Sequence, residues 1–214
     1  MRNFKWGFST LGCPQLSLAE AVKLSDDFDF PYLELRTLEG SLDLPAIFAD
    51  PVKLALLKSL AAAGRVQVLG SSFGIASRKN DNDALAALGR LADSVGIPYL
   101  RVFGGFDFEE EFAEERIAIA LENLAWFRGL GLKAQLALET HDGCSSAARC
   151  RRLIDRVECG IPIVWDAHHT CRYAGETFRD SWELLAGHVH ASFSGPASSG
   201  TSRTVTSARN LCAG

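Results

Sequence analysis

Residues 134–170 read AQLALETHDGCSSAARCRRLIDRVECGIPIVWDAHHT, and this stretch gives the clearest signal of the fold. Two short apolar runs, 134–139 and 161–166, flank a longer amphipathic segment at 145–157. A strand, a helix and a second strand in this order predict a right-handed βαβ unit with parallel strands. Both apolar runs end in a carboxylate, so each strand brings an acidic side chain to the same edge of the sheet.

The same alternation continues through most of the chain. Predicted strands begin near residues 4, 31, 66, 98, 134, 161 and 187, at intervals that average about 30 residues. Amphipathic helices separate them, the last over 176–185, and helix caps are expected at Ser17, Asp50 and Gly96. A doubly wound sheet also alternates in this way, but no G-x-G-x-x-G loop follows the first strand. The pattern predicts an α/β fold, namely a TIM (β/α)8-type barrel.

The length of the chain limits how complete this barrel can be. A full (β/α)8 barrel usually takes about 250 residues and can be as short as about 200, and the chain has 214. Seven units use 1–190, and 16 of the 24 residues that follow are Ser, Thr, Gly or Ala. We therefore expect an incomplete barrel over 1–190 and an atypical tail over 191–214 instead of an eighth unit.

An incomplete barrel leaves unpaired backbone groups at the edges of its first and seventh strands. Two arrangements would cover these edges: a homodimer whose strands pair between chains, or a segment of the tail laid into the gap. The segment 203–206 reads RTVT and has the β-branched residues typical of a strand. The sequence leaves both arrangements open.

Composition narrows the class of function. No apolar run approaches the roughly 18 residues of a transmembrane helix, and the first residues lack the pattern of a secretory signal. A net charge of −4 argues against a nucleic-acid surface. Six cysteines without a C-x-x-C pair are typical of free thiols in a reducing compartment. We therefore expect a cytoplasmic protein with no membrane partner.

The five histidines all lie after residue 140, at or just beyond the predicted end of a strand. Glu139 and Asp166 occupy the same kind of position, and the carboxyl ends of barrel strands converge on one mouth. One such histidine is usually a structural residue, whereas three consecutive strands with this ending indicate a functional cluster. Carboxylate and imidazole groups together can bind Mn²⁺, Mg²⁺, Co²⁺ or Zn²⁺. The histidines are His141, His168, His169, His188 and His190.

Three segments resemble those of a known family: LETHD at 138–142, VWDAHHT at 164–170 and GHVH at 187–190. In this order and spacing they are similar to the xylose-isomerase-like barrel superfamily, which contains sugar phosphate isomerases, sugar epimerases and AP endonuclease family 2. GFSTLGCP, YLELR and LRVFGG support the match at earlier strands. The resemblance implies a sugar (phosphate) isomerase or epimerase that moves a proton next to a carbonyl with the help of a divalent metal ion.

The resemblance also implies roles for individual residues. Glu139, Asp166 and His190 match the metal ligands of strands five, six and seven. Glu139 also matches an acid/base, and His169 matches a histidine that contacts the substrate in epimerases. We therefore expect Glu139 and His169 to be catalytic, and Glu139, Asp166 and His190 to hold a divalent metal ion.

His141, His188 and Arg101 would bind the substrate, a sugar or a sugar phosphate. One family feature is missing, because epimerases carry a further glutamate on strand eight and no carboxylate follows Glu183 here. Two alternatives therefore stay open. One is a truncated or degenerate barrel that at most binds metal or sugar, and the other is an AP-endonuclease-like phosphodiesterase.

Overall fold

The computed structural model describes residues 5–158, 160–194 and 203–206. Eight strands close into a barrel and follow one another around it in chain order. Neighbours from β1 to β7 pair in parallel, and β8 pairs antiparallel with both β7 and β1. The strands are β1 (Lys5–Ser9), β2 (Tyr32–Leu35), β3 (Val66–Gly74), β4 (Tyr99–Phe103), β5 (Gln135–Glu139), β6 (Ile163–Asp166), β7 (Val189–Ser194) and β8 (Arg203–Thr206).

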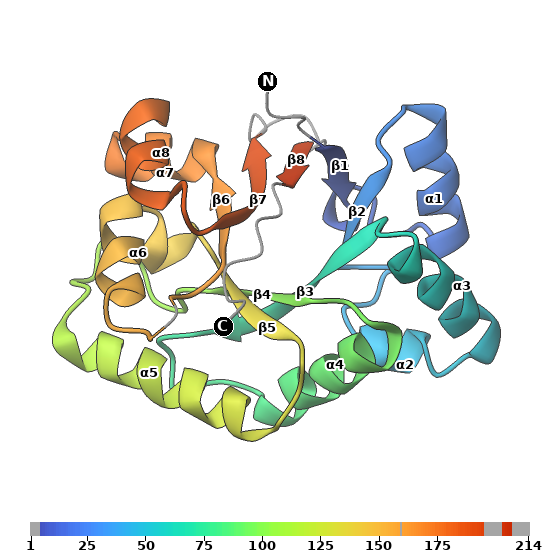
Figure 1. Ribbon diagram of the computed structural model, residues 1–214, viewed down its shortest axis with the longest axis horizontal. Helices are drawn as coiled ribbons and strands as arrows, with labels where there is room; N and C mark the ends of the chain where they lie inside the picture. The colour runs from blue at the N-terminus through green and yellow to red at the C-terminus, as the bar shows by residue number, and fades with distance from the viewer. Residues whose placement is uncertain (1–4, 159, 195–202, 207–214) are drawn as a thin grey trace.

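Helices connect the parallel strands and lie around the barrel (Figure 1). Short 3₁₀ turns follow two of the strands, η1 (Thr10–Gly12) after β1 and η2 (Asp142–Cys144) after β5. The helices are α1 (Leu18–Asp27), α2 (Leu44–Ile47), α3 (Pro51–Ala62), α4 (Asn82–Val95), α5 (Glu114–Gly129), α6 (Ala147–Ile154), α7 (Ala167–Ala174) and α8 (Phe178–Leu185).

The predicted helix caps are confirmed. Ser17 and Glu20 form a reciprocal capping box at the start of α1. The Asp50 side chain accepts hydrogen bonds from two backbone N–H groups at the start of α3, where Pro51 takes the first position. Gly96 ends α4 in the left-handed conformation, at φ 79°. Local sequence therefore sets where these helices begin and end.

Strand β8 closes the barrel, and its residues belong to the segment that the sequence predicts as a tail. Only eight residues, 195–202, separate β7 from β8, and a parallel crossover needs about a dozen or more. Accordingly, β8 runs antiparallel to both β7 and β1 and lies between them (Figure 1). The prediction of an α/β barrel without a regular eighth unit is confirmed.

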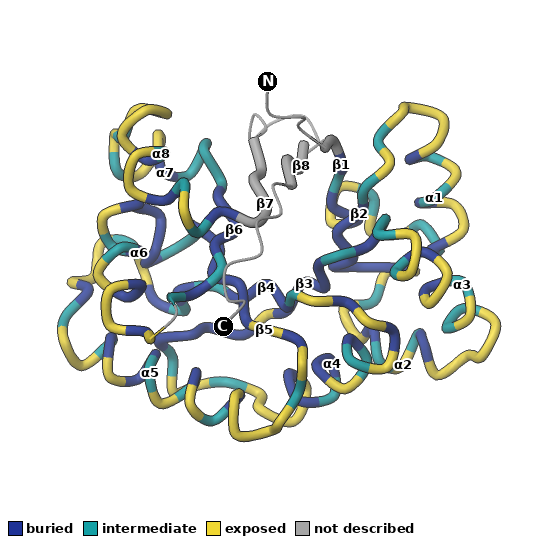
Figure 2. Tube along the Cα trace, viewed as in Figure 1, coloured by how far each residue is buried: buried dark blue, intermediate teal, exposed yellow. Residues whose placement is uncertain are grey.

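The apolar core lies between the outer faces of the strands and the helices. In β2, Leu33 and Leu35 pack outward into this core, whereas Glu34 is equally buried and bonds across the inside of the barrel. Figure 2 shows the buried strands at the centre and the exposed outer faces of the helices. The interior of the barrel is therefore the place where buried charge gathers.

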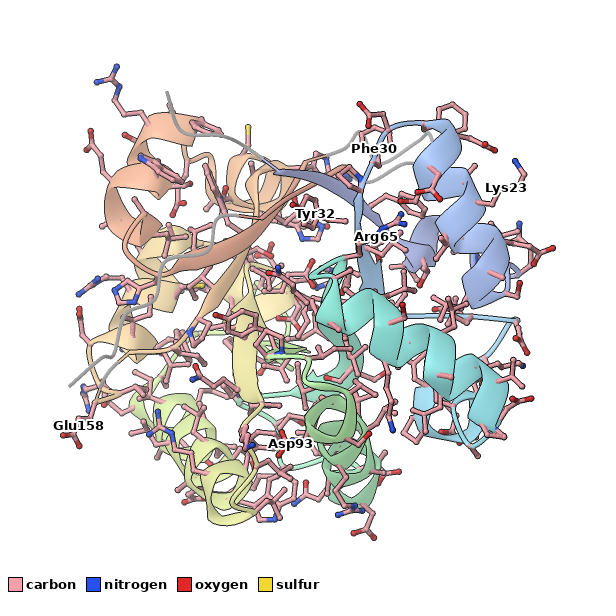
Figure 3. The ribbon with its side chains drawn as sticks, turned by 45° about the vertical axis from the view of Figure 1, so that its right-hand side comes forward. Lys23, Phe30, Tyr32, Arg65, Asp93 and Glu158 are labelled. Atoms are coloured by element: carbon pink, nitrogen blue, oxygen red, sulfur yellow. The ribbon has the colours of Figure 1, made fainter. Side chains whose placement is uncertain are left out.

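Two polar side chains tie helices to neighbouring segments (Figure 3). Arg65, just before β3, bonds to Asp26 of α1 at 2.7 Å and to the carbonyl oxygen of Pro31 at 3.1 Å. Asp93 of α4 accepts the backbone N–H groups of Lys133 and Ala134. These contacts fix the approach to β2 and β5, the strands whose carboxylates meet in the barrel.

Two sequence expectations concern a membrane span and the state of the cysteines. Within the described residues, no helix is long and apolar enough to cross a membrane. The cysteines that the structure describes in this respect are free thiols: Cys13, Cys144, Cys150 and Cys171.

Candidate active site

A chain of ion pairs crosses the inside of the barrel. Arg101 of β4 donates from Nε to Glu34 of β2 at 2.5 Å, and from Nη1 to Glu139 Oε2 of β5. All three side chains are at most 8% exposed. Charges so deeply buried are tolerated when they are paired and hydrogen-bonded, and these are. The three strands therefore place one guanidinium between two carboxylates.

Gly70 of β3 makes room for this network. A Cβ at this position would lie 2.4 Å from Cδ of Arg36 and 2.9 Å from Nη2 of Arg101. Arg36, which follows β2, is itself buried and donates to the Ser72 hydroxyl at 2.7 Å. The lack of a side chain at Gly70 thus leaves room for the two arginine side chains. Gly70 is in register with Arg101 where β3 pairs with β4.

The environment shifts the titration of both central groups. Burial raises the pKa of the Glu139 carboxyl to about 7, although the Arg101 guanidinium opposes the shift. Burial alone would lower the pKa of Arg101, but the carboxylates of Glu139 and Glu34 outweigh it and hold the pKa above its ordinary value. Arg101 is therefore a permanent cation, and Glu139 can give or take a proton near neutral pH.

Two histidines face each other just beyond the end of β5, the strand that carries Glu139. The rings of His141, after β5, and His169, on α7, are 4.3 Å apart between centroids in an edge-to-face arrangement. Nδ1 of His169 lies 3.6 Å from Oδ2 of Asp166, and Phe103 packs against His141 at 4.8 Å. The carboxyl ends of β4, β5 and β6 therefore assemble a cluster at the barrel mouth.

Asp166 also starts helix α7, which the sequence pattern does not reveal. Its Oδ1 accepts from the backbone N–H of His168 at 2.8 Å and of His169 at 3.1 Å. The Thr140 hydroxyl accepts from Asp166 N at 2.7 Å and so joins the ends of β5 and β6. His169 thus sits in the first turn of a helix rather than on an extended segment, and the cap positions it beside His141.

Both histidines are held neutral. Burial lowers the pKa of His141 to about 4, with smaller effects from His169 and Arg101. Burial also lowers the pKa of His169, although the Asp166 carboxylate opposes it. Their Nδ1 atoms are buried and have no hydrogen-bond partner within the described structure. Unpartnered ring nitrogens at a barrel mouth are groups that a ligand can satisfy.

This arrangement makes stability depend on pH through His141. Between pH 6.5 and about 4 the unfolded chain binds a proton on this histidine and the folded chain does not, so stability from this group is lost as the pH falls. We expect His141→Gln to remove that part of the pH dependence. Urea unfolding of both proteins at pH 7, 5.5 and 4.5 measures the difference.

Comparison with the variant isolates the histidine, because other groups act in the opposite direction. Burial raises the pKa of the Asp142 carboxyl from 3.8 to about 6, so this group stabilises the folded state as the pH falls. Asp142 is present in both the wild type and the variant, so its contribution to the pH dependence cancels in the comparison. Equal slopes of stability against pH in the two proteins would contradict the assignment to His141.

His188 is not brought to this cluster. The predicted strand over 187–192 would place it near the mouth, but β7 begins at Val189, in register with Ile163 at the start of β6. His188 therefore precedes the strand and lies 3.2 Å from Nη1 of Arg151 on α6. The strand therefore begins two residues later than predicted, and the role of His188 in substrate binding stays a prediction.

The backbone of His190 belongs to β7, and its side chain lies outside the described part of the structure. The mouth end of β7 is formed by later residues, since Asp166 is in register with Phe193. The structure therefore brings together Glu139, Asp166, His141 and His169, with Arg101 beneath them.

The sequence reading did not single out Glu34, Arg36 or Gly70. A signal for the first two was available in the segment YLELR, because charged residues alternate there with leucines that face the core. Strands of a parallel barrel are usually apolar on both faces. Charge at the inward positions of such a strand indicates a polar lumen, though not which residues pair within it.

A divalent ion does not fit the described donors as they stand. Oε2 of Glu139 is held by the Arg101 guanidinium, and Oδ1 of Asp166 caps α7. Among the residues that the structure describes, no three His, Cys, Asp or Glu side chains are placed to share an ion. The best candidate ligands therefore already have partners within the protein.

Comparison with known proteins identifies the fold. No protein-family model and no curated protein matches the sequence. Among solved structures, the probable 3-DHS dehydratase AsbF from Bacillus anthracis aligns over 88% of this chain and 72% of its own, with a TM-score of 0.71 and 17% identity. These values show that the chain shares the fold of this protein.

Two further structures agree. The IOLI protein, solved with a bound zinc atom, covers 87% of this chain and 71% of its own at 15% identity and a TM-score of 0.61. D-allulose 3-epimerase from Methylomonas sp., solved with D-allulose, covers 89% and 72% at 14% identity and a TM-score of 0.64. The suspected resemblance to xylose-isomerase-like TIM barrels is thus confirmed at the level of the fold.

Proposed function

We propose that the chain is a sugar isomerase or epimerase that moves a proton on a carbon next to a carbonyl group. The observation that supports this best is the pair of neutral histidines at the mouth. His141 and His169 face each other just beyond β5, the strand that carries Glu139, and their buried Nδ1 atoms have no hydrogen-bond partner among the described residues. A substrate rich in hydroxyl groups supplies donors and acceptors for such nitrogens.

The residues of the cluster suit the steps of this chemistry. Glu139 takes the proton as the C–H bond breaks, and the electron pair of that bond forms the double bond of an ene-diolate. The negative charge develops on the former carbonyl oxygen, which N–H donors at the site stabilise. In an isomerase, Glu139 then gives its proton to the neighbouring carbon, and neutral His169 relays the hydroxyl proton of that carbon to the former carbonyl oxygen, accepting at one ring nitrogen and donating from the other. In an epimerase, water on the other face protonates the same carbon, and the proton on Glu139 passes to solvent.

The structural neighbours support the class of substrate. One of them is a D-allulose 3-epimerase whose structure contains D-allulose, a sugar. We therefore propose a small sugar or sugar phosphate as the substrate. Whether the chain works as a homodimer, and whether it is cytoplasmic, stay predictions from the sequence.

Exchange of substrate hydrogen with solvent deuterium tests the function directly. We expect NMR to detect deuterium on the carbon next to the carbonyl when the full chain is incubated in D₂O with a panel of ketoses and aldoses. Glu139→Gln should slow this exchange by roughly 10²- to 10⁴-fold, the range of general acid–base catalysis. Glu122→Gln, at an exposed ion pair on α5, is the matched control and should exchange like the wild type.

The absence of exchange on every sugar tested would refute the proposed function, and so would exchange that survives Glu139→Gln. One observation favours a second candidate, a barrel that binds sugar without turnover: Glu139 and Asp166 both have partners in the protein. This candidate predicts sugar binding by calorimetry with no deuterium uptake. The same two measurements therefore separate the alternatives.

A further inference from the structure

We infer that the guanidinium of Arg101 takes the place of the divalent cation at this site and holds the substrate's carbonyl oxygen. The catalytic part of this inference rests on the proposed function above. The binding part, that Glu139 and Asp166 hold no divalent ion, does not depend on any activity. The two parts are therefore tested by separate measurements.

The first support for the inference comes from the contacts of Arg101. A guanidinium has five N–H donors in a fixed plane, and Arg101 uses Nε for Glu34 and Nη1 for Glu139. Its side chain is only 4% exposed. The two carboxylates hold the plane from two sides, so its orientation in the lumen is set by strands β2, β4 and β5.

The balance of charge points the same way. The carboxylates of Glu34 and Glu139 face the guanidiniums of Arg101 and Arg36, two negative charges against two positive ones, all buried. A divalent ion bound to Glu139 would lie beside the positive charge of Arg101 in a medium of low polarity, where repulsion is strong. The network is therefore complete without a metal ion.

The carboxylate of Asp166 also has contacts within the protein. Its Oδ1 accepts from two backbone N–H groups of α7, so this oxygen fixes a helix terminus. Its Oδ2 lies 3.6 Å from Nδ1 of His169. Oδ1 is therefore committed to the helix terminus, and Asp166 could offer an ion at most the single oxygen Oδ2 beside His169.

Arg101 retains donors for a substrate. Nη2 lies over Gly70, where a Cβ would come within 2.9 Å of it. The hydrogen bonds of Arg101 to described residues use Nε and Nη1, so Nη2 has no protein acceptor among them. As Glu139 removes the proton, these donors stabilise the negative charge on the former carbonyl oxygen, which is the task a metal ion would otherwise perform.

Metal titration of the full chain tests the binding part. After treatment with chelator, we expect calorimetry with Mn²⁺, Co²⁺ and Zn²⁺ to show no site that depends on Glu139 or Asp166. One equivalent of ion that binds to the wild type and is lost in Glu139→Gln or in Asp166→Asn would overturn the inference. Binding that survives both substitutions lies elsewhere, for example at the exposed Cys171, and agrees with it.

Chemical rescue tests the catalytic part. We expect the deuterium exchange of the wild type to be unchanged by chelator, and Arg101→Ala to lose at least 100-fold. Guanidinium chloride at millimolar concentration should restore part of this loss, whereas ammonium chloride should not. Arg101→Lys keeps the charge in the same barrel and serves as a second variant if Arg101→Ala does not fold; we expect at least a tenfold loss from it.

Failure of the proposed function and failure of the inference about Arg101 would give different results. If no sugar exchanges, the proposed function is wrong while the metal titration still decides the binding part. If chelator abolishes the exchange of the wild type and Mn²⁺ restores it, the inference about Arg101 is wrong while the proposed function stands.

Discussion

Replacing Arg101 with methionine should lower the free energy of unfolding by about 3–5 kcal/mol, the cost of breaking a buried ion pair from one side. The substitution leaves the carboxylates of Glu34 and Glu139, 2% and 8% exposed, without their cation. For a chain of this length the loss corresponds to a fall of roughly 10 °C in the melting temperature. Urea unfolding monitored by circular dichroism measures it.

Arg78→Met is the matched control for this prediction. Arg78 pairs with Glu122 at 3.1 Å, but both side chains are 62% exposed, so its removal should cost less than about 1 kcal/mol. Combining Arg101→Met with Glu34→Gln and Glu139→Gln should recover part of the stability, because the unpaired charges are then gone. An Arg101→Met protein as stable as the Arg78→Met control would contradict the ion-pair network.

Replacing Gly105 with alanine should lower the free energy of unfolding by about 2–5 kcal/mol. Gly105 follows β4 at φ 83°, a conformation that alanine adopts at a cost of roughly 1–2 kcal/mol. A Cβ there would also lie 2.5 Å from Cα of Gly74, and forcing atoms together in a packed region costs about 1–3 kcal/mol more. Backbone lies on both sides of this contact, so neither side can rotate away.

Gly131→Ala separates the two causes. Gly131 has a similar φ of 68°, and no atom lies within 4 Å of the Cβ it would gain. We expect this control to show only the conformational cost. The difference in the free energy of unfolding between the two variants then measures the approach of the ends of β3 and β4. Equal losses of unfolding free energy in the two variants would contradict the close approach of Gly105 to Gly74.

The fold could be predicted because its signals are local. Capping residues and alternating apolar runs define each strand and helix without reference to distant parts of the chain, as the caps at Ser17, Asp50 and Gly96 show. Helix α7 was missed because Asp166 both ends β6 and caps α7, so that no residue separates the strand from the helix. The start of β7 was missed because register across β6 and β7 depends on pairing, not on composition.

The candidate site could be predicted only in part for the same reason. Glu139, Asp166, His141 and His169 follow strand ends, and a barrel brings strand ends together whatever their sequence. The ion pair between Glu34 and Arg101 joins β2 to β4 across the lumen and depends on Gly70 leaving space between them. Such a contact between non-neighbouring strands has no signature in the sequence of either strand. The roles of the site residues stay predictions until exchange is measured.

The antiparallel strand β8 has a consequence for how the chain folds. Lys5 of β1 is in register with Thr206 of β8, so this pairing joins residues about 200 positions apart. Contacts between such distant residues are slow to form, because the chain between them must be ordered first. The seven parallel strands are therefore expected to assemble before β8 docks. The seam between β7 and β1 then opens more readily than any other part of the barrel, and amide hydrogen exchange should be fastest in β8 and the strand edges beside it.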